Sequence, residues 1–242
     1  MKGKVLSVLL LLTATVGAQP ACLNEIRACV ETRYNMYETK WICTGDTLTV
    51  DSSDIYEPYW QIDGYWMTCQ EITQDLWQWF MHYNPSTDTG ALLPVTNITR
   101  SEADSFCIQL SKATRQQWRV PTKEEWLFAY NGGIFSEGYQ HSGSDNIKYV
   151  GWTKENSKGK LHLGGKLIPN ELGIQDMDGN VAEMVTDGDS VLFAGRHFRQ
   201  PVVKAKSPFI VKEQNCPPEC RGMRIVGHQA LWFNKYGERV YR

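Results

Sequence analysis

Residues 118–133 read WRVPTKEEWLFAYNGG and contain the clearest helix signal of the chain. Thr122 and Glu125 have the spacing of a capping box, in which each side chain accepts a hydrogen bond from the other residue's backbone N–H. Trp126 and Tyr130 follow four residues apart and so share one face of the predicted helix. Gly132-Gly133 supply the permissive backbone that ends it. The stretch therefore predicts a short helix with an aromatic face.

The same signals predict two earlier helices. The first begins at Thr73 and stops before Asn84-Pro85, because proline disfavours the helical conformation in the residue before it. The second begins at Thr99, which has Glu102 three residues later and so repeats the capping box. Their inner faces are expected to carry Leu76, Trp77, Phe80, Ala103, Phe106, Cys107 and Leu110. No long helical period follows Gly133, which predicts a loop-rich second half closed by short strands.

Composition places the chain among ordinary globular proteins, with 242 residues, 42% apolar and 21% charged. Lys plus Arg number 25 and Asp plus Glu 27, which gives a net charge of −2. The charges are scattered and form no basic stripe, so we expect no nucleic-acid partner. The motifs Gly-x-Ser-x-Gly, Gly-x-Gly-x-x-Gly and the phosphate-binding P-loop are absent from the sequence, which argues against the common hydrolase and nucleotide-binding sites.

Residues 1–18 have the pattern of a secretory signal peptide. Lys2 and Lys4 precede an apolar run at Val5–Leu12, and the small residues 16–18 follow as a cleavage site. We therefore expect a secreted, periplasmic or cell-envelope protein with no transmembrane segment, because the apolar run is too short to span a bilayer. Cys22 lies near the cleavage site, and lipid anchoring at this residue remains an alternative.

The mature chain is predicted to have three parts: a Cys-containing leader at 19–55, a main domain at 56–232 and a tail at 233–242. The leader is expected to hold a strand at residues 47–50. Seven cysteines favour an oxidising compartment and disulfide bonds, whose connectivity the sequence leaves open. Cys107 lies on the inner face of the second helix, which is consistent with a buried thiol.

Several blocks, in this order, carry a family resemblance: residues 94–99 (PVTNIT), 118–126 (WRVPTKEEW), 169–183 (PNELGIQDMDGNVAE) and 222–226 (GMRIV). Together they resemble the formylglycine-generating enzyme, or sulfatase-modifying factor, domain family. The resemblance implies an α+β, C-type-lectin-like fold with two to three helices beside small twisted antiparallel sheets and much irregular loop. It also implies that Arg119 forks onto a carboxylate and that Trp126 fills the core. As an alternative to a buried thiol, the resemblance implies a bridge from Cys107 to the closing segment near Cys220.

The block from Asp176 to Glu183 is the candidate metal site. Members of the family that bind calcium here use positions that match Asp176, the carbonyls of Gly179 and Val181, and Glu183. Calcium prefers several oxygen ligands, and a tight glycine turn can direct carbonyls and carboxylates to one point. In the alternative interpretation, Asp176, Asn180 and Glu183 cap turns and hydrogen-bond loop amides without an ion. The sequence leaves both open.

The resemblance also implies where a catalytic centre would lie. Enzymes of the family oxidise a substrate cysteine with oxygen through a copper-binding cysteine pair, and the matching positions fall near Arg199 and Lys204. No cysteine occurs between Cys107 and Cys216, so copper is not expected. Cys216 and Cys220 are a weak catalytic alternative, because a C-x3-C with two prolines inside is more typical of a disulfide.

The sequence thus leaves two hypotheses of function. The first is a non-catalytic binding or structural module, and the second is an oxidoreductase that converts a sulfatase cysteine to formylglycine. The missing copper pair favours the first. Candidate ligand-binding residues are Arg196, His197 and Arg199, at the place of the lost centre, and His141 in a preceding loop. The ligand, whether protein, peptide or glycan, is not specified by the sequence.

Overall fold

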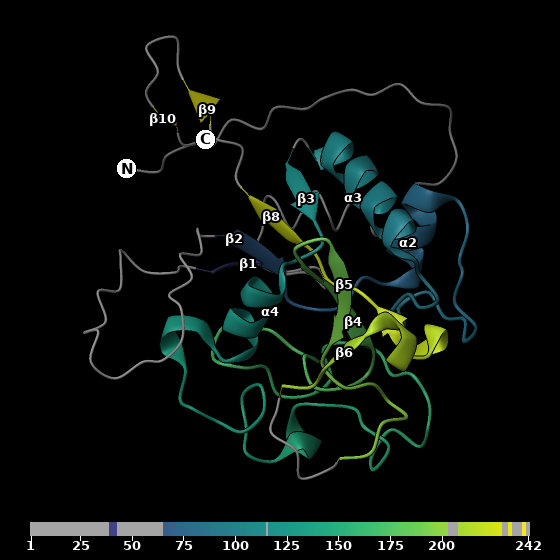
Figure 1. Cartoon of the computed structure of the whole chain (residues 1–242), viewed down its shortest axis with the longest axis vertical. Helices are drawn as coiled ribbons and strands as arrows, with labels where there is room; N and C mark the ends of the chain where they lie inside the picture. The colour runs from purple at the N-terminus through teal and green to yellow at the C-terminus, as the bar shows by residue number, and fades with distance from the viewer. Residues whose placement is uncertain are drawn as a thin grey trace, which may run out of the picture.

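The computed structural model of the protein describes residues 39–42, 65–114, 116–202, 208–228, 232–233 and 239–240. This part of the chain contains the helices α2 (Gln74–Met81), α3 (Arg100–Thr114) and α4 (Lys123–Tyr130), as Figure 1 shows. The three predicted helices are confirmed, and each begins directly after the threonine expected to cap it. Single 3₁₀ turns are η1 (Gly133–Phe135), η2 (Ile147–Tyr149), η3 (Glu213–Asn215) and η4 (Pro218–Cys220).

Local hydrogen bonds explain where α4 begins. The Thr122 hydroxyl accepts from the Glu125 N–H at 3.2 Å, and the Glu125 carboxylate accepts from the Thr122 N–H at 2.8 Å. The predicted capping box is therefore present. Arg119 donates to both oxygens of the same carboxylate at 2.7 and 2.6 Å, which confirms the predicted fork.

Two four-stranded sheets organise the domain. The first has the order β1-β2-β8-β3 and is antiparallel; its strands are Thr39–Ile42, Tyr65–Thr68, Val226–His228 and Gln117–Arg119. The second has the order β6-β5-β4-β7, with β4 and β7 parallel; its strands are Ile210–Lys212, Ser190–Ala194, Ala182–Asp187 and Arg221–Gly222. A separate hairpin pairs β9 (Trp232–Phe233) with β10 (Arg239–Val240). The α+β class is confirmed.

Strand β1 belongs to the predicted leader, yet it pairs with β2 in register from Thr39 opposite Thr68 to Ile42 opposite Tyr65. The leader therefore contributes an edge strand to the first sheet. The strand predicted at 47–50, the signal peptide and Cys22 lie outside the described residues. No helix in the described part of the chain is both long and apolar enough to cross a bilayer.

Aromatic side chains fill the core around the helices. Trp77 of α2 stacks on Phe106 of α3 with ring centroids 5.2 Å apart, and Phe80 meets Phe106 edge to face at 5.8 Å. Trp126 and Tyr130 of α4 stack at 5.1 Å in a second buried cluster. Complete burial of such a side chain contributes about 3 kcal/mol each, so the predicted inner faces hold the helices on the sheets.

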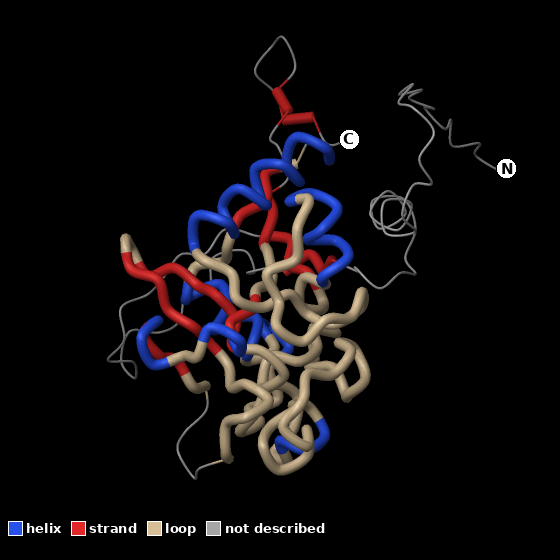
Figure 2. Tube along the Cα trace, turned by 90° about the vertical axis from the view of Figure 1, so that its right-hand side faces the viewer, coloured by secondary structure: helices blue, strands red, loops and turns tan. Residues whose placement is uncertain are grey.

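The segment between α4 and β4 has no long helix or strand, and Figure 2 shows loops filling this end of the molecule. Buried side-chain amides make hydrogen bonds to backbone groups of this segment. The Asn170 Nδ2 donates to the Ala129 carbonyl at 2.8 Å, and its Oδ1 accepts from the N–H groups of Leu172 and Ile174 at 3.0 and 3.1 Å. The loop-rich half predicted from the sequence is thus a fixed structure that carries the candidate site.

Candidate functional site

A buried ion pair joins the Asp176–Glu183 block to the closing strand. Arg224 donates to the two carboxylate oxygens of Glu183 at 2.5 and 2.6 Å, and both residues are fully buried. The indole N–H of Trp126 donates to the same carboxylate at 2.6 Å. The remaining guanidinium donors reach the carbonyls of Thr68 and Gln175 at 2.9 and 2.8 Å. These bonds join strand β4, helix α4, strand β2 and the loop at Gln175 to the closing segment that carries Arg224.

Two more carboxylates lie near this pair. Glu71 accepts from the Asn180 Nδ2 at 2.8 Å and from the Val181 N–H at 3.1 Å. Burial, with the neighbouring Asp176 charge adding to it, raises the pKa of Glu71 well above its ordinary value. Burial also raises the pKa of Asp176 to about 6. Asp176 accepts from the Gly165 N–H through Oδ2, at 2.6 Å, while its buried Oδ1 has no hydrogen-bond partner among the described residues.

This arrangement bears on the predicted calcium ligands. Both oxygens of Glu183 are already engaged by Arg224 and Trp126, so this carboxylate does not fit a calcium ligand set without losing a buried ion pair. Within the described residues, no group of three or more His, Cys, Asp or Glu side chains could hold a metal ion. For Asp176 and Asn180 the contacts favour the alternative interpretation, because these side chains accept from the loop N–H groups of Gly165 and His162. Glu183 instead bonds two side chains, and calcium binding stays a prediction.

A second buried network contains two of the predicted ligand-binding residues. Arg196 is fully buried and donates to Asp178 at 2.9 Å. The His141 Nδ1 lies 3.1 Å from the other oxygen of Asp178, which also accepts from the Tyr130 hydroxyl. Arg196 and His141 thus meet at one carboxylate in the loop region. Arg196 is fully buried there, while the His141 side chain is partly exposed.

The other two predicted residues line a cavity of about 280 Å³ beside the end of β5, hereafter the β5 cavity. Its lining consists of Ala182, Gly195, His197, Arg199, Gln200, Pro201, Phe209, Val211, Asn215 and Pro217. The turn at 195–200 presents one wall, and β6 with η3 presents the other. Phe198, between the two basic residues, points into the core and is fully buried.

The protonation of His197 and the contacts of Arg199 determine what the two basic side chains of the β5 cavity can bond. Burial, with the nearby Arg199 charge, lowers the pKa of His197 to about 4, so the imidazole is neutral at neutral pH. Its Nδ1 accepts from the Arg199 N–H at 3.3 Å, which leaves the ring proton on Nε2 as a donor. The Arg199 guanidinium pairs with Glu219 at 2.8 Å and lies 5.0 Å from the Phe198 ring centre.

The cysteines next to this cavity face the core. Asn215 and Pro217 line the β5 cavity, while Cys216 between them is 2% exposed and Cys220 is fully buried. Burial raises the pKa of the Cys216 thiol to about 11 and that of Cys220 to about 12. No disulfide joins the cysteines of the described residues to one another, and Cys107 is buried as predicted. Neutral, buried thiols are poor nucleophiles and poor copper ligands.

Sequence reasoning missed several residues of these sites. Glu71 bonds Asn180, which lies 109 residues away in the sequence. Asp178 bonds His141, which is 37 residues away, as well as Arg196, which is 18 residues away. Asn215 and Gln200 reach the β5 cavity only because β6 and the 195–200 turn close on each other.

Comparisons with known proteins agree with this architecture. Residues 24–229 match the model of the sulfatase-modifying factor enzyme 1-like domain. Chaperone protein LppX of Paenibacillus barcinonensis is 25% identical over 223 residues, which cover 72% of this chain and 78% of the relative. Among solved structures, the Treponema denticola variable protein 1 matches with a TM-score of 0.64 and 22% identity over 78% of this chain and 94% of that one.

Two further structures share the fold. CarF has a TM-score of 0.60 and 18% identity, covering 79% of this chain and 98% of its own. PvdO from Pseudomonas aeruginosa has a TM-score of 0.55 and 17% identity, covering 79% and 92%. These matches confirm the fold that the sequence blocks implied. The chain belongs to the sulfatase-modifying factor enzyme 1-like domain family.

Proposed function

We propose that this chain is an exported, non-catalytic member of its family that binds a segment of another protein in the β5 cavity. The observation that carries the proposal is the lining of this cavity. It lies where the family resemblance puts the copper-binding cysteines, and its described lining offers imidazole, guanidinium and amide groups but no thiol. The sequence between Cys107 and Cys216 holds no cysteine that could complete a pair.

The thiols of Cys216 and Cys220 support the non-catalytic interpretation. A cysteine that binds copper or attacks a substrate acts as the thiolate, which requires a lowered pKa and access to the reactant. Both thiols are buried in the core, and burial raises the pKa of Cys216 to about 11 and that of Cys220 to about 12. Redox chemistry at this pair would require the closing segment to rearrange.

The chemistry of the β5 cavity suits a polypeptide ligand. The His197 Nε2–H and the side-chain amides of Gln200 and Asn215 can bond the carbonyl and N–H groups of an extended peptide. Phe209 and Val211, with two prolines, form an apolar wall for its side chains. The relative from Paenibacillus barcinonensis is named a chaperone, which by its name acts on other proteins. Export rests on the signal-peptide pattern of residues 1–18.

The experiment selects random peptides displayed on phage against the mature protein and measures the affinity of the enriched peptides by fluorescence anisotropy. We expect His197→Ala and Asn215→Ala each to weaken binding about tenfold, because both remove a polar contact inside the cavity. Lys160→Ala, an exposed side chain outside the cavity, is the matched control and should bind as the parent does. Failure to enrich any peptide, or equal affinity for all variants, would contradict the proposal.

A further inference from the structure

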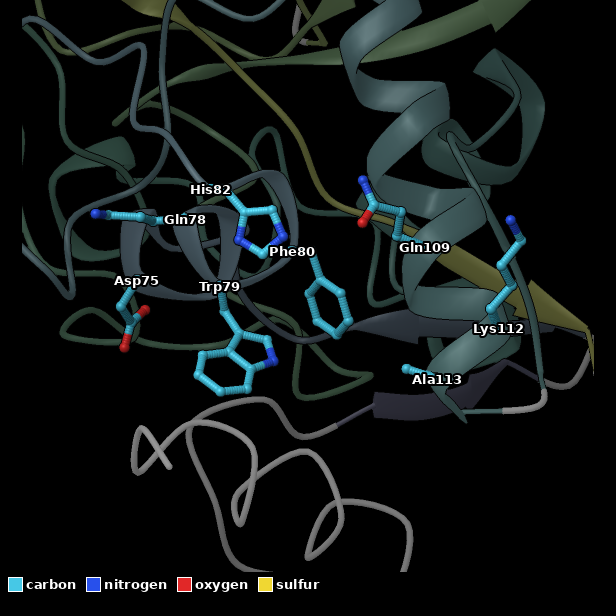
Figure 3. Close-up of a pocket in the computed structure, with 8 residues that line it drawn as sticks. All are labelled: Asp75, Gln78, Trp79, Phe80, His82, Gln109, Lys112 and Ala113. Atoms are coloured by element: carbon cyan, nitrogen blue, oxygen red, sulfur yellow. The ribbon is translucent and has the colours of Figure 1, made fainter. Parts of the chain in front are cut away.

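A second and larger cavity lies between α2 and α3. This α2–α3 groove has a volume of about 1090 Å³ and shares no lining residue with the β5 cavity. The described residues that line it are Asp75, Gln78, Trp79, Phe80, His82, Gln109, Lys112 and Ala113. Figure 3 shows the rings of Trp79 and Phe80 in the middle of this set, with the imidazole of His82 and the amide of Gln109 beside them.

The aromatic base of the α2–α3 groove is fixed by the core. Phe80 is 7% exposed and packs edge to face on Phe106, and the half-buried Trp79 packs against the same core cluster. The indole N–H of Trp79 has no hydrogen-bond acceptor among the described residues. The groove therefore presents a rigid aromatic surface together with an unused donor, at a low cost in side-chain ordering.

The polar rim of the groove is rich in hydrogen-bonding groups and nearly neutral. Gln78, His82 and Lys112 are exposed, and their side chains make no hydrogen bond or ion pair to the described residues. Among the residues that the structure describes, the amide of Gln109 has only the Met81 sulfur as a partner, at 3.4 Å. Asp75 and Lys112 carry opposite charges, so net charge does not select the ligand.

These features identify the kind of ligand. An apolar helix or lipid chain would cover the amides of Gln78 and Gln109 without bonding them, and each buried unpaired group costs about 1–3 kcal/mol. A sugar ring has C–H faces that pack on an indole and hydroxyls that both donate and accept. Amides, a carboxylate, an imidazole and an ammonium group around an aromatic ring match those hydroxyls.

We propose that the α2–α3 groove is a carbohydrate-binding site, with Trp79 as the stacking platform and Gln78, Gln109 and His82 as hydroxyl partners. A volume of about 1090 Å³ is at the upper end for a single small ligand, so the groove accepts several sugar units of a chain. This inference concerns a face of the molecule other than the β5 cavity and does not depend on the peptide proposal.

The test titrates the full mature chain with cellohexaose, chitohexaose and mannohexaose by calorimetry, with the indole N–H signals followed by NMR. We expect saturable binding of at least one of the three. Trp79→Ala should weaken it about tenfold through loss of the stacking surface, and Gln109→Ala severalfold. Tyr149→Ala, an aromatic residue that is 56% exposed and lies outside the groove, is the matched control and should leave affinity unchanged.

Trp79 also packs on the core, so a second variant keeps the test decisive if Trp79→Ala does not fold. Gln78→Ala removes an exposed side chain of the groove that has no packing partner in the core, and it should weaken binding with an unchanged melting temperature. The proposal is overturned if none of the three sugars binds, which is also the result if another part of the protein covers the groove. It is equally overturned if affinity survives in both the Gln78 and the Gln109 variants.

Discussion

Replacing Arg224 with methionine should be among the most damaging single changes in the described part of the chain. The guanidinium makes two bonds to Glu183, at 2.5 and 2.6 Å, and also donates to the carbonyls of Thr68, Cys69 and Gln175, at 2.9, 3.3 and 2.8 Å. Methionine has a similar length but donates nothing. Within the described part of the chain, the substitution therefore leaves the fully buried Glu183 carboxylate with the Trp126 indole as its one remaining partner.

The size of the effect follows from this geometry. Removing one partner of a buried ion pair costs about 3–5 kcal/mol, and the loss of the bonds to backbone carbonyls brings the effect to the upper part of that range. Domains of this kind have a total stability of about 5–15 kcal/mol, so the variant should remain folded only marginally. Adding Glu183→Leu to the same chain removes the stranded charge and should recover part of the loss.

Urea unfolding at 25 °C measures these free energies for the parent, both single variants and the double variant. Arg100→Met is the matched control, because its pair with Asp104 at 2.8 Å is about 40% exposed and should contribute less than about 1 kcal/mol. A loss below about 1 kcal/mol for Arg224→Met, or a double variant as unstable as the sum of the singles, would refute the reasoning.

Three further predictions concern single sites. Thr122→Ala removes the capping box of α4 and should lower the free energy of unfolding by about 1 kcal/mol in urea titrations; no measurable loss would contradict this. Burial lowers the pKa of His197 from 6.5 to about 4, so the unfolded state binds the proton first and stability falls as pH drops through this interval. His197→Gln should make the melting temperature depend less on pH between pH 6.5 and about 4. A pH dependence as steep as that of the parent would contradict this prediction. In the reduced native protein, iodoacetamide at pH 8 should label Cys216 and Cys220 slowly, since their pKa values are about 11 and 12, and labelling as fast as in urea would show them to be accessible.

The helices could be predicted because their signals are local. Thr99 and Thr122 each have a glutamate three residues later, and the capping bonds that follow need no other part of the chain. The sheet could not be predicted in this way. Strand β2 pairs with β8, so Trp66 lies opposite Gly227 across most of the domain, and nothing near either residue indicates the partner.

The residues of the candidate site also differ in how far the sequence could predict them. His197 and Arg199 were predicted from their place in the chain, and the structure puts both in the β5 cavity. Arg196 was predicted with them, but it is fully buried because its partner, Asp178, lies inside the loop region 18 residues earlier. Glu183 was predicted as a calcium ligand, whereas its ion pair depends on Arg224, which is 41 residues away. Pairings through space decide such roles, and the sequence does not contain them.

The central claim, that this family member does not carry out the copper chemistry, has one direct test. The purified mature protein is loaded with copper(I) and incubated with oxygen and a Cys-x-Pro-x-Arg peptide, and formylglycine is quantified by mass spectrometry. The account predicts no formylglycine above the level of copper without protein. Turnover that is present in the parent and lost in Cys216→Ala or Cys220→Ala would contradict it and would make the closing segment a catalytic centre.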